Sequence, residues 1–383
     1  MADAGSNLPS RGQSTPLVPP LYQSSVYTLP DLDALDSILD TGAPGFIYAR
    51  DGHPNARHLA EQLREMENAS WSIVSGSGMG AVTAALLTVV QQGDRIVASN
   101  SLYGRTTQLL GKELDRFGVK TTFVDARDLR QVRAALEKPA KVLFVETMSN
   151  PLLAVADVPA LAELARAQQC LLMVDNTFAT PTLCRPLDLG ADFVVESLTK
   201  MIGGHSDVTL GVVCGNGNHL LGITSLISIW GLASNPFDCW LASRGLATLG
   251  LRMRAASENA AALADWLAHQ GGVSRVVYPG RPDHPDYAVA RRVLPEGCGN
   301  MVAFELAGGR DAVNRFMRQA GGIPFSPSLG HFATTCSHPA ATSHRYVSPA
   351  ERKRQGITDG LVRLSVGVED LKGIEEEMKR GLA

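Results

Sequence analysis

The stretch Ala191–Asp207, ADFVVESLTKMIGGHSD, joins an apolar run to a polar segment that contains a lysine. The run Phe193–Val195 predicts a buried strand, and two hydroxyls and the lysine follow it: Ser197, Thr199 and Lys200. Burial just past a strand, or a neighbouring cation, lowers the pKa of a lysine, and a neutral amine is what a Schiff base needs. The two hydroxyls can donate to an anion. The alternative interpretation is a strand followed by a solvated lysine.

Short apolar runs alternate with helix-like segments from Trp71 to Gly215. The runs are continuous rather than alternating, which is typical of strands covered on both faces. Such alternation predicts an α/β fold with a mostly parallel sheet, helices on both faces and ligands beyond the carboxyl ends of the strands. The predicted strands are Arg95–Ala98, Thr122–Val124, Val142–Val145, Leu171–Val174, Phe193–Val195 and Leu210–Cys214.

The rest of the chain predicts a smaller α+β domain. Pro236–Gln270 has no interior proline and predicts one long helix that leads into this domain, with Arg244, Arg252 and Arg254 on its polar side. We therefore divide the chain into an arm (1–58), a large domain (59–240) and a C-terminal domain (241–383). The smaller domain has predicted strands at Val273–Tyr278, Met301–Leu306 and Val362–Val366, and an amphipathic helix from Asp370.

Composition excludes several classes of protein. The chain has 383 residues, 45% of them hydrophobic and 19% charged, and a net charge of −3, which offers no basic field for nucleic acid or an acidic membrane surface. No apolar stretch approaches a membrane span, and the N-terminus is not a secretory signal. Six scattered cysteines without a Cys-x-x-Cys pair predict reduced thiols in the cytoplasm, and no cysteine or histidine spacing fits a metal site.

Glycines and polar residues follow several of the predicted strands. Ser75–Gly80, SGSGMG, precedes an alanine-rich helix and predicts either a phosphate site or a plain tight turn. Its spacing is not the dinucleotide-binding GxGxxG. Asp175 can hold a protonated ring nitrogen or cap a turn, Asn150 can bind a ring hydroxyl, and Tyr103 can stack on an aromatic ring.

Two arginines complete the set of candidates. Arg50, near Tyr48 in GFIYARDGHPN, has the planar fork that suits phosphate. Arg363 lies in an apolar run, LVRLSVG, where an unpaired guanidinium is expensive; a substrate carboxylate or an internal acid would satisfy it. A lysine, an acid for a ring nitrogen, an anion site, an aromatic and an arginine together suit pyridoxal phosphate acting on an amino acid.

The chain resembles the cysteine and methionine metabolism family of pyridoxal-phosphate enzymes, from about Leu21 to Gly381. This family contains cystathionine γ-synthases, cystathionine and methionine lyases, and O-acylhomoserine sulfhydrylases. The segments that carry the resemblance are LYQSSVY, YARDGHPN, SGSGMG, LYGRT, ETMSNP, DNTFATP, SLTKMIGGHSD, NPFDCWLASRGLATLGLRM, SLG…HPA and VRLSVGVED.

The resemblance implies an aminotransferase-like fold and a role for each candidate residue. Lys200 would bind the cofactor and shuttle protons, and Tyr103 would stack on the ring and assist catalysis. Asp175 would pair with the ring nitrogen. The residues implied to hold the phosphate are Gly78, Met79, Ser197 and Thr199, with Tyr48 and Arg50 of a neighbouring subunit. Those implied to bind the carboxylate of the substrate and the ring hydroxyl are Asn150, Ser328 and Arg363, with Tyr48 also near the substrate. Shared sites imply a homotetramer built from two dimers.

Four positions depart from the family and bear on the substrate: His53, Arg105, His331 and Ala333. Ala333 stands where many members carry a glutamate, so the acid for a distal amino group is missing. We favour a C–S lyase of the cystathionine or methionine γ-lyase kind, acting by β- or γ-elimination. The alternatives are a γ-synthase or sulfhydrylase that uses an O-acyl- or O-phosphohomoserine, and a nucleotide-binding oxidoreductase or non-catalytic binding protein.

Overall fold

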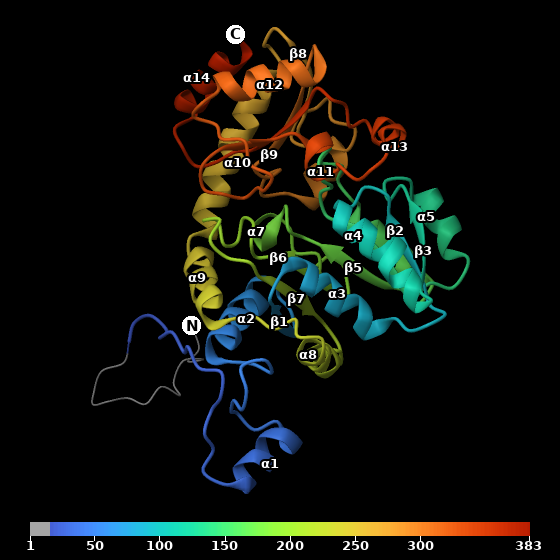
Figure 1. Cartoon of the computed structure of the whole chain (residues 1–383). Coiled ribbons are helices and arrows are strands. Elements are labelled where there is room, and N and C mark those ends of the chain that lie inside the picture. The colour runs from blue at the N-terminus through green and yellow to red at the C-terminus, as the bar shows by residue number, and fades with distance from the viewer. Residues whose placement is uncertain (1–15) are drawn as a thin grey trace.

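The structure, a computed structural model, describes residues 16–383 (Figure 1); the first 15 residues of the predicted arm lie outside them. Its large sheet has seven strands in the order β1-β7-β6-β5-β4-β2-β3. Only β7 runs against the others, which confirms the predicted mostly parallel α/β sheet. The strands are β1 (Trp71–Ser75), β2 (Arg95–Ser99), β3 (Lys120–Val124), β4 (Val142–Glu146), β5 (Leu171–Asp175), β6 (Phe193–Ser197) and β7 (Gly211–Gly215).

Helices cover both faces of this sheet because its strands carry apolar side chains on both sides. One face packs against α3 (Gly78–Val89), α4 (Gly104–Gln108), the π-turn and 3₁₀ turn that follow it (Leu109–Glu113 and Leu114–Phe117) and α8 (Leu220–Ile229). The other face packs against α2 (Pro54–Met66), α5 (Leu129–Leu136), α6 (Val158–Ala167), α7 (Thr180–Leu183) and the helices that lead into the smaller domain.

The smaller sheet has four antiparallel strands in the order β10-β11-β9-β8. Its core is continuous with the second face of the large sheet. The strands are β8 (Val273–Val277), β9 (Met301–Leu306), β10 (Thr335–Ser337) and β11 (Leu361–Ser365); the helical segments are α11 (Tyr287–Val293), α12 (Gly309–Gln319), a 3₁₀ turn (Pro339–Ala341), α13 (Pro349–Arg354) and α14 (Leu371–Leu382).

The prediction of one helix over Pro236–Gln270 is wrong, because α9 (Pro236–Leu246) ends before α10 (Leu249–Leu267) begins. Arg252, expected on the polar side, is instead half-buried under the loop that follows Lys200. Its guanidinium donates to the carbonyls of Met201 at 2.6 Å and Ile202 at 3.1 Å, and to that of Gly245 at 2.7 Å. The bond to Gly245 satisfies a carbonyl near the end of α9. Arg252, at the start of α10, thereby ties the break between the two helices to the loop that follows Lys200.

The arm before α2 is joined to α2, α8 and α9 by hydrogen bonds, but its own helix does not pack into the core. Its helix α1 (Leu32–Thr41) has no buried residue, and Figure 1 shows it below the large sheet and apart from the other helices. Within residues 16–383 no helix is long and apolar enough to cross a membrane.

Candidate active site

The glycine-rich turn of SGSGMG forms the N-terminus of α3 at the edge where β6 ends. Ser77 caps the helix, because its hydroxyl accepts from the Gly80 N–H at 2.9 Å. Among the described residues, the other N–H groups of the first turn have no such side-chain cap and remain available to a ligand. A Cβ on Gly78 would lie 2.7 Å from that of Ser197, so only glycine allows the turn to approach the end of β6 so closely. Free amides, a helix dipole and the Ser197 hydroxyl suit a phosphate.

The other two residues predicted to bind the phosphate, Thr199 and Met79, make different hydrogen bonds. The Thr199 hydroxyl exchanges hydrogen bonds with the backbone of Leu210, donating at 3.3 Å and accepting at 3.2 Å. Met79 is in the first turn of α3, and its Sδ accepts from the Thr106 hydroxyl at 3.9 Å. Thr199 can reach an anion only by giving up its bond to the Leu210 carbonyl, whereas the backbone amide of Met79 belongs to the helix N-terminus.

Lys200 lies three residues past the end of β6, beside the loop that precedes β10. Its Nζ donates to the Ser328 hydroxyl at 3.0 Å. Burial, and then the charge of Arg363, lowers the pKa of Lys200. Gly330 packs directly on the Lys200–Met201 backbone, where a Cβ would lie 2.6 Å from the Lys200 carbonyl carbon. The sequence thus fixes a lysine whose neutral form is favoured, as covalent chemistry at an amine requires.

Arg363, on β11, is a buried cation without an acidic partner. Only 3% of it is exposed, and in the described part of the chain it forms no ion pair. Its guanidinium donates to the Asn150 side-chain oxygen at 2.8 Å and the Ser328 carbonyl at 3.0 Å, while its Nε has no partner among these residues. Burial lowers its pKa to about 10, against the opposing effect of nearby Tyr103. An anionic ligand would satisfy this group.

Asp175 and Glu146 are the last residues of the adjacent parallel strands β5 and β4 and are paired in register. The Asp175 carboxylate accepts from the Thr177 N–H at 3.0 Å, and Glu146 accepts from the Tyr103 N–H at 2.6 Å. Burial raises the pKa of Asp175; burial, and then the charge of Asp175, raises the pKa of Glu146 well above its usual range. A cationic ring nitrogen placed here would favour the ionised form of Asp175.

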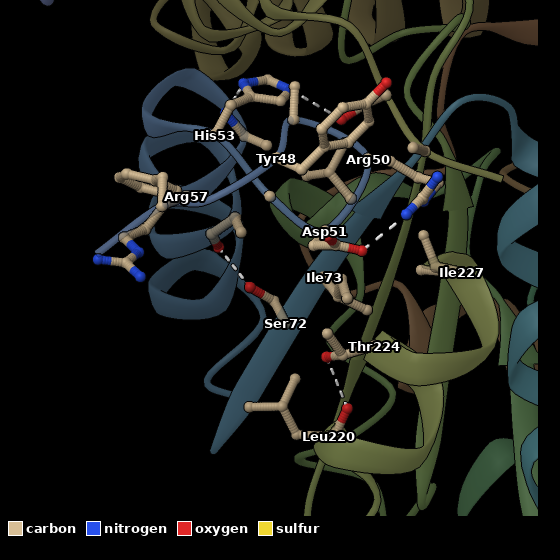
Figure 2. A pocket seen from close by; sticks show the side chains of 18 of the residues that line it. Tyr48, Arg50, Asp51, His53, Arg57, Ser72, Ile73, Leu220, Thr224 and Ile227 are labelled. Carbon is tan, nitrogen blue, oxygen red and sulfur yellow. Dashed lines mark hydrogen bonds and ion pairs between the residues drawn. The ribbon is translucent and has the colours of Figure 1, made fainter. Parts of the chain in front are cut away.

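The arm residues Tyr48 and Arg50 lie at a different place on the chain. The Arg50 guanidinium stacks over the Tyr48 ring at 4.9 Å, and its Nε lies 3.4 Å from the Ser228 hydroxyl on α8. They border a hollow of about 670 Å³ between the arm, α2, β1 and α8 (Figure 2). Among the described residues neither side chain has a hydrogen bond to the glycine turn, so a phosphate role would require them to come from another copy.

The positions that depart from the family have defined contacts. His53 caps α2 by accepting from the Ala56 N–H at 3.1 Å. His331 is turned toward Ser206, with Nδ1 3.2 Å from the hydroxyl, and its ring contacts that of Phe332 at a tilt, with the ring centroids 4.2 Å apart. Both histidines therefore have structural contacts.

Some site residues were missed from the sequence. Glu146 was visible in ETMSNP as a carboxylate at a strand end, but its place beside Asp175 depends on the strand order. His344 is buried, and burial, Arg363 and Arg352 lower its pKa to about 4. Nothing in the local sequence signals that environment. Among residues 16–383 no group of three or more metal-ligating side chains could hold a metal ion.

The mostly parallel sheet has helices on both faces. At its strand ends lie a lysine of lowered pKa, a helix N-terminus that suits a phosphate, and a buried acid. This combination defines a pyridoxal-phosphate enzyme of aminotransferase-like fold. The chain belongs to the Cys/Met metabolism PLP-dependent enzymes, because the model of that family matches residues 2–383.

Three relatives illustrate the range of this family. The chain is 42% identical to O-succinylhomoserine sulfhydrylase of Pseudomonas aeruginosa, over 89% of this chain and 84% of that protein. It is 37% identical to L-methionine gamma-lyase of Pseudomonas putida, over 96% and 92%. Cystathionine gamma synthase of Xanthomonas oryzae pv. oryzae, solved with cystathionine, superposes with a TM-score of 0.90 at 35% identity, over 95% of this chain and 92% of that one. These matches confirm the predicted family, the predicted cofactor and the prediction that the chain is an enzyme.

Proposed function

We propose that this enzyme performs β- or γ-elimination on a sulfur-containing or O-activated homoserine-type amino acid, and that it is favoured as a C–S lyase of the cystathionine or methionine γ-lyase kind. The observation that carries the proposal is Arg363, a buried guanidinium with a free Nε and no acidic partner among residues 16–383. A substrate α-carboxylate would satisfy this guanidinium within reach of Lys200. The Lys200 amine donates a hydrogen bond to the hydroxyl of Ser328, and Arg363 donates one to the carbonyl of the same residue. Methionine gamma-lyases and a cystathionine beta-lyase are among the relatives.

Pyridoxal phosphate, when bound, supplies an electron sink for the negative charge that develops at the α-carbon. Lys200 acts as the base because burial and Arg363 favour its neutral form. Ser328 holds the amine by a hydrogen bond that can be released or re-formed as the proton moves. Arg363 and Asn150 fix the substrate carboxylate, so that the α-proton is presented to Lys200.

Residues at the strand ends complete the binding of the cofactor. Asp175 would hold the ring nitrogen and favour its protonated form, and Glu146 fixes the backbone of Tyr103, whose ring would cover the cofactor. The cradle for the phosphate is formed by the amides at the start of α3 with nearby side chains: Gly78, Met79, Ser197 and Thr199.

Tyr48 and Arg50 complete the phosphate site of a second copy, and Tyr48 also borders the substrate there, in a homotetramer of two dimers. The absence of buried residues on α1 and the exposure of the Tyr48 ring, at 41%, support this arrangement. The same proposal includes the division into an arm (1–58), a large cofactor-binding domain (59–240) and a C-terminal domain (241–383). Six unpaired, buried cysteines support a cytoplasmic location.

The second candidate function is γ-replacement on an O-acylhomoserine. The 42% identity to an O-succinylhomoserine sulfhydrylase favours it. γ-Elimination and γ-replacement use the same residues up to the loss of the γ-substituent. They differ in whether a nucleophile then adds to the γ-carbon that the substituent has left.

The test uses the holoenzyme and a panel of substrates. L-Methionine, L-cystathionine, L-homocysteine and O-acylhomoserines are supplied with and without a thiol, and 2-oxo acid and thioether products are quantified. A 2-oxo acid from a thioether without added thiol supports the lyase, whereas product only from an O-acylhomoserine plus thiol favours replacement. The Lys200→Ala variant is expected to lose turnover and the visible absorption of the bound cofactor. Appreciable turnover in that variant would refute the role of Lys200.

A further inference from the structure

Two glutamates that the proposed chemistry does not use lie buried beside each other, between α2 and the large sheet. Glu67 follows the last residue of α2 and is 0% exposed; Glu196 is in β6, one residue before Ser197, and is 1% exposed. Successive side chains of a strand point to opposite faces, so Glu196 points to the face of the sheet opposite to that of Ser197. Within residues 16–383 neither glutamate belongs to an ion pair.

Both carboxyl groups accept hydrogen bonds from one amide, that of the buried Asn176. Its Nδ2 donates to Oε1 of Glu67 at 3.1 Å and to Oε1 of Glu196 at 3.4 Å. The second oxygen of each glutamate, Oε2, is buried and has no donor in the described part of the chain. Two buried carboxylates that lack donors would be costly, whereas a proton on one of them gives the other the hydrogen bond that it lacks.

The groups around the two glutamates do not neutralise them. Burial raises the pKa of Glu67 to about 8, and burial and then the charge of Glu67 raise the pKa of Glu196 well above its usual range. Arg185 opposes this effect on Glu67, but it is ion-paired with Asp188 at 2.8 Å, and Asp175 adds negative charge near Glu196. Two thiols also face the pair and stay neutral, because burial and then the glutamates raise the pKa of each: Cys184 and Cys214.

Asn176 connects the two glutamates to three of the strand ends at which the cofactor is proposed to bind. Its backbone N–H donates to the carbonyl of Val195, on β6, at 2.9 Å. Its side-chain oxygen accepts from the hydroxyl of Thr147, the residue after β4, at 2.8 Å, and its Nδ2 also donates to the Cys184 carbonyl at 2.9 Å. Asn176 itself follows Asp175, the last residue of β5. The position of the Asp175 carboxyl therefore depends on the network that the glutamates hold.

We propose that Glu67 and Glu196 hold a proton between them at neutral pH and act as positioning residues for the cofactor. The protonated pair keeps the Asn176 amide in place, and with it the strand ends that carry Asp175 and Ser197. Loss of this proton at alkaline pH leaves two carboxylates in contact, so the network opens and the cofactor binds less tightly. The inference goes beyond the proposed function, because it concerns retention of the cofactor and holds whichever substrate reacts.

The test compares the wild-type holoenzyme with the double variant Glu67→Gln, Glu196→Gln, whose amides fill the same space and cannot ionise. The dissociation constant of pyridoxal phosphate is measured from its visible absorption between about pH 7 and 10. Across this range the wild-type constant is expected to rise at least about tenfold more than that of the variant, with a midpoint near pH 8, where the pKa of Glu67 lies. The infrared spectrum of the wild type at neutral pH should contain the carbonyl stretch of a protonated carboxyl that the variant lacks.

The matched control is Glu65→Gln, which removes a carboxylate from an exposed position on the same helix. Both of its readouts are expected to equal those of the wild type. The proposal is overturned by a difference between the wild type and the double variant below about threefold, by an equal change in the control, or by the absence of the infrared difference.

If the double variant does not fold, the wild type decides alone. Its carboxyl band must then weaken over the same pH range as the binding of pyridoxal phosphate, and midpoints that differ by more than about one pH unit overturn the proposal. The assays contain no substrate, so their outcome is separate from any failure of the proposed function.

Discussion

Replacing Arg363 with alanine tests the anchor on which the proposed chemistry depends. The guanidinium already donates to Asn150 and Ser328, and its remaining N–H groups are free for a substrate carboxylate. A charged hydrogen bond to a buried carboxylate contributes about 2–4 kcal/mol, so Arg363→Ala is expected to lower kcat/KM by roughly 30- to 800-fold. Most of the loss should lie in KM, with a smaller fall in kcat from poorer alignment of the α-proton.

The assay is steady-state production of 2-oxo acid by holoenzyme whose cofactor content has been matched. Arg363→Lys is the control variant, because it keeps the charge and loses the planar fork, and it should recover only part of the activity. Thermal unfolding must accompany the kinetics, since the truncation also leaves the Asn150 oxygen and the Ser328 carbonyl without donors. A change in kcat/KM of less than about threefold in Arg363→Ala would refute the carboxylate role and leave Arg363 a structural residue.

Three further outcomes are expected. Arg252→Met, which removes the bonds to the loop after the lysine, should lower the free energy of unfolding by about 2–3 kcal/mol and speed cofactor release, whereas exposed Arg254→Met should change both little. His344→Asn should make the free energy of unfolding depend less on pH between about 4 and 6.5, as measured by urea unfolding across that range. The folded-state pKa of His344 is lowered to about 4, so its contribution to stability is complete above pH ~6.5 and is lost as the pH falls toward 4, by up to about 3 kcal/mol. Mixing inactive Arg50→Ala and Lys200→Ala subunits should restore about a quarter of the wild-type activity if sites are shared, and none if each chain completes its own site.

The parts of the fold that were predicted correctly are those in which local sequence and tertiary structure require the same residues. The strands at the centre of the sheet are continuous apolar runs because helices cover both faces, and that pattern is visible without the fold. The positions of Lys200 and Asp175 at strand ends could be predicted for the same reason, since a polar residue at the end of such a run lies at the carboxyl edge of a parallel sheet.

The parts that were missed depend on contacts between distant segments. No residue between α9 and α10 signals a helix break; the break accompanies a guanidinium that reaches back from Arg252 to Gly245 and across to Met201. Glu146 becomes part of the site only because β4 lies next to β5 in the sheet. The lowered pKa of His344 arises from Arg363 and Arg352 together, and its burial depends on the whole loop.

In the proposed mechanism, the charge of Arg363 couples binding of the substrate carboxylate to proton transfer at Lys200. Burial, and then the charge of Arg363 when nothing neutralises the guanidinium, disfavours the charged form of Lys200, so its free amine is a better base at neutral pH than a solvated lysine would be. A bound α-carboxylate cancels that repulsion, which raises the pKa of Lys200 and makes proton uptake more favourable. Asp175 lies beside Glu146, whose pKa is raised well above its usual range by burial and then by the charge of Asp175, and it would be the acceptor for a cationic ring nitrogen. The carboxylate that anchors the substrate thereby also prepares Lys200 to receive the α-proton.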